Sequence, residues 1–259
     1  MLVSTPAVVL QTFRYSETSK IVRLATRDFG VQSAIAKGVL RPKSPFGAGL
    51  ETLSEGVAQL YHRETRELQT LAAFDVLELR RGLARDLGRF AGAAVLAEVM
   101  LKMAPAAALP AAYAALTQGL DALAAATPAQ ADPVAARWLW LLVGVLGFAP
   151  QLDACVRDGT PVAGNGRQAV AFSAAEGGVL CARCGGGEPP PPTRLPAEAY
   201  HDLLALNDAS AALPVWDAPH AAAHRRLVAR FVRHHLGESG PVPALDFWER
   251  RAWVTPAAS

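Results

Sequence analysis

The chain has 259 residues, 51% of them hydrophobic, and a formal net charge of only +2. These values predict a globular protein of one or two domains, and they exclude both a disordered chain and one drawn to nucleic acid or membrane by its overall charge. Three cysteines, an odd number, do not suggest a secreted disulfide scaffold. No signal-peptide pattern opens the chain, and the apolar run at 138–150 is too short to span a bilayer. We therefore expect a cytoplasmic protein with no membrane partner.

Residues 7–79 alternate between apolar, β-branched runs and polar turns, a pattern that predicts strands. In the second run, Ile21 and Arg23 should face one side of a sheet and Val22 the other. Five short strands without a long helix predict a small Greek-key barrel, of which the oligonucleotide-binding (OB) fold is the common version. A small β-sandwich or an SH3-like barrel has the same strand count. The strands are expected at 8–14, 21–25, 31–36, 54–62 and 68–79.

From Arg80 onward the apolar residues recur at helical spacing, which predicts a change from β to α structure. The sequence thus predicts a multi-domain α+β protein with a barrel domain at 1–79 and a helical domain at 80–259. An insert at 150–193, rich in glycine and proline, breaks the helical pattern. The tail after Gly237 looks irregular. Helices are expected at 87–103, 111–126, 134–147, 196–206 and 220–236.

The loop at 37–49 concentrates basic residues and contains no acid. Its glycines and prolines forbid a long helix and favour an exposed, shaped loop. Cations beside the ring of Phe46 would suit a polyanion with stackable bases, whereas the alternative is a solvated loop whose Phe46 tucks onto the core. The basic side chains of the loop are Lys37, Arg41 and Lys43, and the rest of residues 1–50 adds Arg14, Lys20, Arg23 and Arg27 against only Glu17 and Asp28.

All three cysteines lie in the insert. Cys181 and Cys184 form a Cys-x-x-Cys-Gly knuckle, a turn that brings two thiolates to one metal. The other half would begin at Cys155, but Asp158 stands at its second ligand position. The alternatives are one structural zinc held by these four residues and a knuckle that has lost its metal but keeps its turns. A redox pair is disfavoured because no βαβ pattern surrounds the motif.

The helix predicted at 220–236 carries arginines at three- to four-residue spacing, with no acid between them. Such a face suits a track of phosphates, although a solvated helix face is the alternative. Motifs of nucleotide-dependent or hydrolytic enzymes are missing, so we expect a binding protein rather than an enzyme. The arginines are Arg225, Arg226, Arg230 and Arg233.

Several sequence blocks lie in a characteristic order along the chain. They are Val9-Leu10, Tyr15-Ser16-Glu17-Thr18-Ser19, Phe29-Gly30, Ala36-Lys37-Gly38, Arg41-Pro42-Lys43-Ser44, residues 146–155 and residues 177–184. The order of the blocks is more specific than any one of them, and together they resemble the bacterial recombination mediator family RecO.

The resemblance implies an OB domain, a helical domain and a zinc-knuckle insert. It implies binding of single- and double-stranded DNA, annealing of complementary strands, and joint action with RecR to load RecA onto DNA coated by single-strand binding protein, in the cytoplasm at the nucleoid. The family's basic OB surface falls on Lys37, Arg41 and Lys43, with Arg14, Lys20 and Arg23 as further candidates.

By the same resemblance, the knuckle ligands fall on Cys155, Cys181 and Cys184, with Asp158 as the fourth. The helix before Leu146 is similar to the one that receives the acidic tail of single-strand binding protein. Arg137 matches a basic position in that helix.

Overall fold

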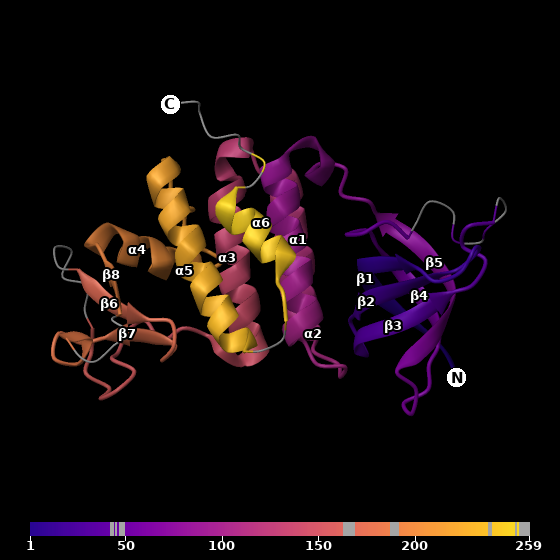
Figure 1. Cartoon of the computed structure of the whole chain (residues 1–259), viewed down its shortest axis with the longest axis horizontal. Coiled ribbons are helices and arrows are strands. Elements are labelled where there is room, and N and C mark those ends of the chain that lie inside the picture. Colours follow the sequence, from indigo (N-terminus) through magenta and orange to yellow (C-terminus); the bar gives the residue numbers. More distant parts are fainter. Residues whose placement is uncertain are drawn as a thin grey trace. The chain divides into compact units, whose positions relative to one another are not determined.

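The computed structural model describes residues 1–41, 44, 46, 50–162, 169–186, 192–237, 240–251 and 253. The chain forms two compact units, Met1–Ala125 and Ala126–Ser259. Strands β1 to β5 come first and a largely helical remainder follows (Figure 1), which confirms the predicted α+β class. The domain boundary predicted after residue 79 stays a prediction, because the first compact unit contains the barrel together with the first two helices.

The five N-terminal strands close into a barrel in the order β1-β2-β3-β5-β4. All neighbours are antiparallel except β3 and β5, which pair in parallel. This closed ring confirms the predicted OB-like barrel and excludes a two-sheet sandwich. The strands are β1 (Leu2–Arg14), β2 (Lys20–Thr26), β3 (Gly30–Ala36), β4 (Glu55–Tyr61) and β5 (Leu68–Glu78).

The alternation of side chains explains which residues fill the barrel. Val22 is fully buried in its core, whereas Ile21 and Arg23 are part-exposed on the outside, as predicted. In β1, the pairing register shifts between Val9 and Gln11. This bulge changes the phase of the strand, so that Phe13, which would otherwise face inward with Val9, is 46% exposed.

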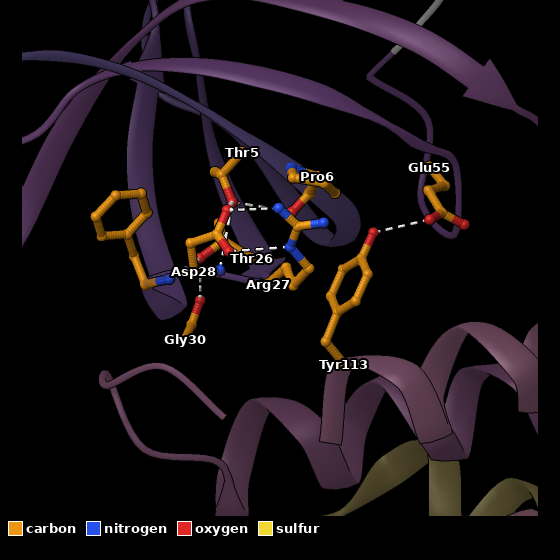
Figure 2. Close-up of polar contacts among 9 residues, drawn as sticks. Thr5, Pro6, Thr26, Arg27, Asp28, Gly30, Glu55 and Tyr113 are labelled. Atoms are coloured by element: carbon orange, nitrogen blue, oxygen red, sulfur yellow. Dashed lines mark hydrogen bonds and ion pairs between the residues drawn. The ribbon is translucent and has the colours of Figure 1, made fainter. Parts of the chain in front are cut away.

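The turn between β2 and β3 is held by one side chain at the end of β2 and one from β1 (Figure 2). The Thr26 hydroxyl donates to the Gly30 carbonyl (2.7 Å), and the Thr5 hydroxyl donates to the Asp28 carboxylate (2.8 Å). Gly30 has a φ of +66°, and a Cβ atom there would lie 2.3 Å from the carbonyl oxygen of Ala107. Only glycine satisfies both the turn and this close approach.

Two helices complete the first unit, α1 (Leu87–Met103) and α2 (Pro110–Ala125), after a short 3₁₀ turn, η1 (Leu83–Arg85). The guanidinium of Arg80, 1% exposed, forms ion pairs with Glu55 at the start of β4 and with Asp121 of α2, the latter at 2.6 Å. The Tyr113 hydroxyl also donates to Glu55 (2.8 Å; Figure 2). Arg80 therefore ties the barrel to α2.

The second unit is built on α3 (Ala131–Val143), which continues as a π-helical turn, η3 (Gly144–Phe148), and ends where Gly147 adopts a φ of +98°. The rings of Trp140, Phe172 and Phe231 meet in its core, with centroids 4.8–6.3 Å apart. The remaining helices are η2 (Pro128–Gln130), η4 (Cys184–Gly186), α4 (Ala197–Leu206), α5 (Ala218–Leu236) and α6 (Pro243–Arg250). The irregular tail expected after Gly237 was thus wrong.

The insert forms a three-stranded sheet in the order β7-β6-β8 that the sequence did not predict. Its strands, β6 (Val170–Ser173), β7 (Gly178–Leu180) and β8 (Thr193–Leu195), have three or four residues each. Such runs are too short to show an alternating pattern.

One described helix, Pro128–Phe148, is long and apolar enough to cross a bilayer, but 61% of its apolar window is buried. Its Leu139 and Trp140 lie in the interior of the fold. Burial of this kind is typical of a core helix in a soluble protein.

Replacing Arg80 by glutamine should destabilise the protein by about 3 kcal/mol, because a buried charge network loses its central cation. Urea denaturation measures the effect. Arg81→Gln, an exposed neighbour, is the matched control and should change stability by less than about 0.5 kcal/mol. Equal losses in both variants would contradict the role assigned to Arg80.

Candidate nucleic-acid interface and metal centre

Strand register gathers predicted DNA-binding cations at one end of the barrel. Arg14 lies opposite Lys20 in the β1–β2 pair, Lys20 lies opposite Ala36 in the β2–β3 pair, and Lys37 follows directly. Arg14 and Lys37 are exposed and Lys20 is part-exposed. Three cations from separate stretches of sequence are therefore neighbours.

Arg41 joins this group through the backbone of its loop. The Leu40 N–H donates to the carbonyl of Thr18 in the β1–β2 turn (3.0 Å), which fixes the start of the loop beside that turn. Gly38, at a φ of +70°, makes the bend, and the Arg41 N–H donates to its carbonyl (3.0 Å). We call Arg14, Lys20, Lys37 and Arg41 the barrel-end patch. None of the four forms an ion pair with a described carboxylate.

The other predicted cations of this surface lie elsewhere or cannot be placed. Arg23 is on the outer face of β2, opposite Gln11 and Ser33 and further along the strand from the patch. Lys43 lies outside the described residues. Phe46 is 4% exposed within the barrel core, so its ring anchors the loop and is not offered to a base.

Two exposed aromatic rings lie at the same end of the barrel as these cations, and sequence reasoning missed them. Phe13 is 46% exposed and Tyr15 is 60% exposed, and both flank Arg14. The sequence placed Tyr15 in a polar turn and Phe13 in a strand, and the bulge in β1 that exposes Phe13 leaves no mark in the sequence. The signal that could have found them is their position on either side of a cation beside a polar turn.

The loop between β4 and β5 is shaped by one buried side chain. Gln69, 2% exposed, donates through Nε2 to the carbonyls of Arg63 (3.0 Å) and Arg66 (2.5 Å) and accepts from the Arg63 N–H (2.9 Å). The side chains of Arg63 and Arg66 remain exposed. In OB barrels, this loop, the β1–β2 loop and the β2–β3 face bind oligonucleotides.

The predicted knuckle residues do come together. The ligand atoms of Cys155, Asp158, Cys181 and Cys184 all lie within 4.8 Å of one another and could hold a metal ion. The Cys184 and Cys181 thiols lie 3.3 and 3.5 Å from Oδ2 of Asp158. In a tetrahedral zinc site a sulfur and an oxygen ligand are about 3.6 Å apart. The donor set and its spacing therefore fit zinc.

Two groups hold the Asp158 carboxyl in its ionised form. The backbone N–H of Thr160 and then the Arg183 guanidinium keep the pKa of Asp158 well below its usual range. Desolvation, with hydrogen bonds to Cys181 and Asp158, raises the pKa of Cys184 to about 12. In the metal-free cluster, Cys184 is therefore a neutral thiol that can donate to the carboxylate.

Two family models cover this chain. Residues 1–80 match the N-terminal part of recombination protein O, and residues 84–242 match its C-terminal part. The chain belongs to the RecO family.

Curated relatives agree with this assignment. The chain is 33% identical to the DNA repair protein RecO of Rubrobacter xylanophilus over 234 residues, 90% of each chain. It is 35% identical to the RecO of Anaeromyxobacter sp. (strain K) over 243 residues, 91% of this chain and 92% of the relative. The RecO family is thus a family of DNA repair proteins to which nearly the whole chain is similar.

Within this RecO-family chain, the predicted arginine track on α5 is only partly available. Arg225 is 4% exposed, and its guanidinium forms an ion pair with Asp132 in the first turn of α3 (2.6 Å). Its Nε also donates to the carbonyl of Glu249 (3.2 Å). Arg225 cannot reach a phosphate from this position, which corrects its predicted role. It joins α3, α5 and α6 instead.

Arg233 is also engaged within the fold. It forms ion pairs with Asp246 (2.6 Å) and Glu249 (2.5 Å) of α6, the helix that the sequence analysis missed. Arg226 and Arg230 are exposed, and Arg230 donates to the Thr193 hydroxyl (2.8 Å). The track is thereby reduced to these two arginines.

Arg137, predicted to contact an acidic tail, points inward. It is 6% exposed, and its Nη2 donates to the carbonyls of Ala205 (3.1 Å) and Ala212 (3.0 Å). Burial lowers the pKa of Arg137. The side chain fastens the end of α4 and the segment after it to α3, which corrects its assignment as a surface contact.

Exchanging Arg225 for alanine should destabilise the protein by about 3 kcal/mol, since the buried Asp132 would keep only the longer ion pair with Arg251 (3.9 Å). Arg226→Ala removes an exposed charge one residue away and should cost less than about 0.5 kcal/mol. Chemical denaturation of both variants makes the comparison. A stable Arg225→Ala protein with weakened DNA binding would restore the sequence-based assignment.

Proposed function

We propose that the protein is a non-enzymatic recombination mediator that binds single- and double-stranded DNA through the barrel-end patch. The observation that supports this most directly is the gathering of four cations, from β1, β2 and the loop after β3, with no described acid paired to them. Uncompensated cations on one surface attract phosphates and release counterions when they bind.

The surroundings of the patch favour DNA over an acidic protein surface. Phe13 and Tyr15 offer exposed rings at the same end of the barrel, and bases can stack on such rings while the backbone follows the charges. The patch also lies at the β1–β2 loop, one of the regions through which OB barrels bind oligonucleotides.

The steps beyond DNA binding rest on membership of the RecO family and on the resemblance described above. The protein anneals complementary strands and, with RecR, helps to load RecA onto DNA coated by single-strand binding protein, in the cytoplasm at the nucleoid. Arg226 and Arg230 supply a second basic surface, which would reduce repulsion between two strands. RecR and the acidic tail of single-strand binding protein are the proposed protein partners, and Arg137 would support such a tail site only from beneath the surface.

A structural zinc is the proposed cofactor of the insert. Cys155, Asp158, Cys181 and Cys184 would hold it. The part of the insert around these ligands has a small hydrophobic cluster. This cluster consists of Cys155, Ala171 and Leu180 with a few partly buried neighbours. Zinc would contribute folding energy to such a small sheet.

The double charge reversal Lys37→Glu/Arg41→Glu should weaken binding of the protein alone to labelled single-stranded DNA and make its salt dependence shallower. The slope of log K against log salt should fall by about 0.7 for each phosphate that the variant no longer neutralises. Fluorescence anisotropy across a salt series provides both values.

The matched control is Arg81→Glu/Arg85→Glu, which reverses two exposed charges between the barrel and α1. It should leave affinity and slope near wild-type values. If the wild-type protein gives no anisotropy change at low salt, the protein is a scaffold that binds only other proteins.

Removing the rings with Phe13→Ala and Tyr15→Ala should weaken single-stranded DNA binding by about 1–3 kcal/mol per stacked base. Duplex binding should change little, since paired bases are not free to stack on the surface, and the salt slope should stay constant because no charge is removed. Phe90→Ala, at an equally exposed aromatic of α1, is the control. Equal losses for duplex and single strands would argue against stacking.

A further inference from the structure

The fourth position of the knuckle is built around a carboxylate rather than left vacant by the loss of a cysteine. Asp158 lies in a tight turn, in which the Gly159 N–H donates to the Cys155 carbonyl and the Cys155 N–H donates to the Thr160 carbonyl (both 2.8 Å). Oδ1 of Asp158 accepts from the Thr160 N–H (3.0 Å). A cysteine could not make this last hydrogen bond with comparable strength.

The second oxygen, Oδ2, serves two kinds of donor. It accepts from Nη2 of Arg183 at 2.6 Å and from the thiols of Cys184 and Cys181 at 3.3 and 3.5 Å. Arg183 lies between these two cysteines in the sequence, so the ligand turn itself brings the guanidinium to the carboxylate.

A metal replaces the thiol protons and leaves the guanidinium in place. Zinc binds thiolates, so the protons that the thiols offer to Oδ2 are released when it binds. The Arg183 bond uses a separate donor, and a carboxylate oxygen has room for both a metal and a hydrogen bond. Nothing in this arrangement requires Arg183 to leave when the ion enters.

Charge favours the same conclusion. Thiolates from three cysteines together with the Asp158 carboxylate outweigh the charge of Zn²⁺. A cation beside the cluster offsets part of that excess. The Arg183 side chain is 81% exposed, so solvent screens its charge, and its main effect is to hold the carboxylate in the ligand position.

We propose that Arg183 is a positioning residue for zinc, which holds Asp158 so that the carboxylate replaces a fourth thiolate. This inference rests on the zinc site proposed above. The opposite arrangement is that Arg183 occupies the place of the ion and competes with it. The two differ in sign, because removing a positioning residue weakens zinc binding and removing a competitor strengthens it.

The test is a zinc titration of the full chain against a chromogenic chelator. Arg183→Ala should weaken zinc affinity by about 10- to 100-fold, the usual effect of losing an outer-shell partner. Arg183→Lys should recover part of the loss, because a single ammonium can still contact Oδ2. Arg250→Ala, at an exposed arginine of α6 outside the insert, is the matched control and should bind zinc like the wild type. Unchanged or tighter binding by Arg183→Ala would overturn the proposal.

A double-mutant cycle that combines Arg183→Ala with Asp158→Cys tests whether Arg183 positions the carboxylate or only stabilises the turn. If Arg183 acts mainly through the carboxylate, the loss of zinc affinity caused by Arg183→Ala should become much smaller once a thiolate replaces Asp158, with a remainder from the screened charge of Arg183 beside Cys184. An equal loss in both backgrounds means that Arg183 acts on something else and refutes the inference. Arg183→Gln provides a second variant should the alanine protein fold poorly, as judged by circular dichroism.

The outcomes also separate this inference from the site on which it rests. A wild-type protein that takes up no zinc removes the proposed zinc site, and the inference with it. A wild-type protein that binds one equivalent, with affinity indifferent to Arg183, removes the inference alone.

Discussion

Strand register in the closed barrel is the constraint on which the candidate DNA surface depends. Arg14 and Lys20 flank the β1–β2 turn and Lys37 lies a strand further along the chain, and the three become neighbours because β1, β2 and β3 pair as they do. A slip of one residue would turn alternate side chains to the other face and disperse the group. The bulge in β1 belongs to the same constraint, since it turns Phe13 outward with Ile21, at the same end of the barrel as the cations but on the face opposite Arg14. The barrel core and the proposed interface are thus fixed by one set of hydrogen bonds.

The sequence was informative wherever a local pattern determined the structure. The alternation in β2 and the helical period of α1 gave their elements nearly to the residue, because each pattern is long enough to repeat. The spacing of Cys181 and Cys184 also located half of the metal-ligand cluster. Short or weakly patterned segments were missed, namely the three strands of the insert and α6.

The roles of basic residues were harder to predict than secondary structure, because the sequence does not show which acid a basic side chain will contact. Arg225 and Arg226 are adjacent and chemically identical, yet one is buried against Asp132 and the other is exposed. The acid that neutralises Arg225 comes from α3, far away along the chain, and those that neutralise Arg233 come from α6, a helix that the sequence did not predict. The burial of Phe46 could not be predicted either, because only the closed barrel shows that its ring is part of the core.

The hydrogen bonds of Gln69 fix the backbone path of the β4–β5 loop independently of the side chains that the loop carries. The loop is held through its backbone carbonyls by a buried residue of β5, and its own side chains contribute nothing to these bonds. Substitutions at positions 63–67 can therefore alter the charge and contacts of this rim while its backbone path stays the same. During evolution, substitutions in this loop can therefore change the ligand preference of the protein without a loss of folding stability.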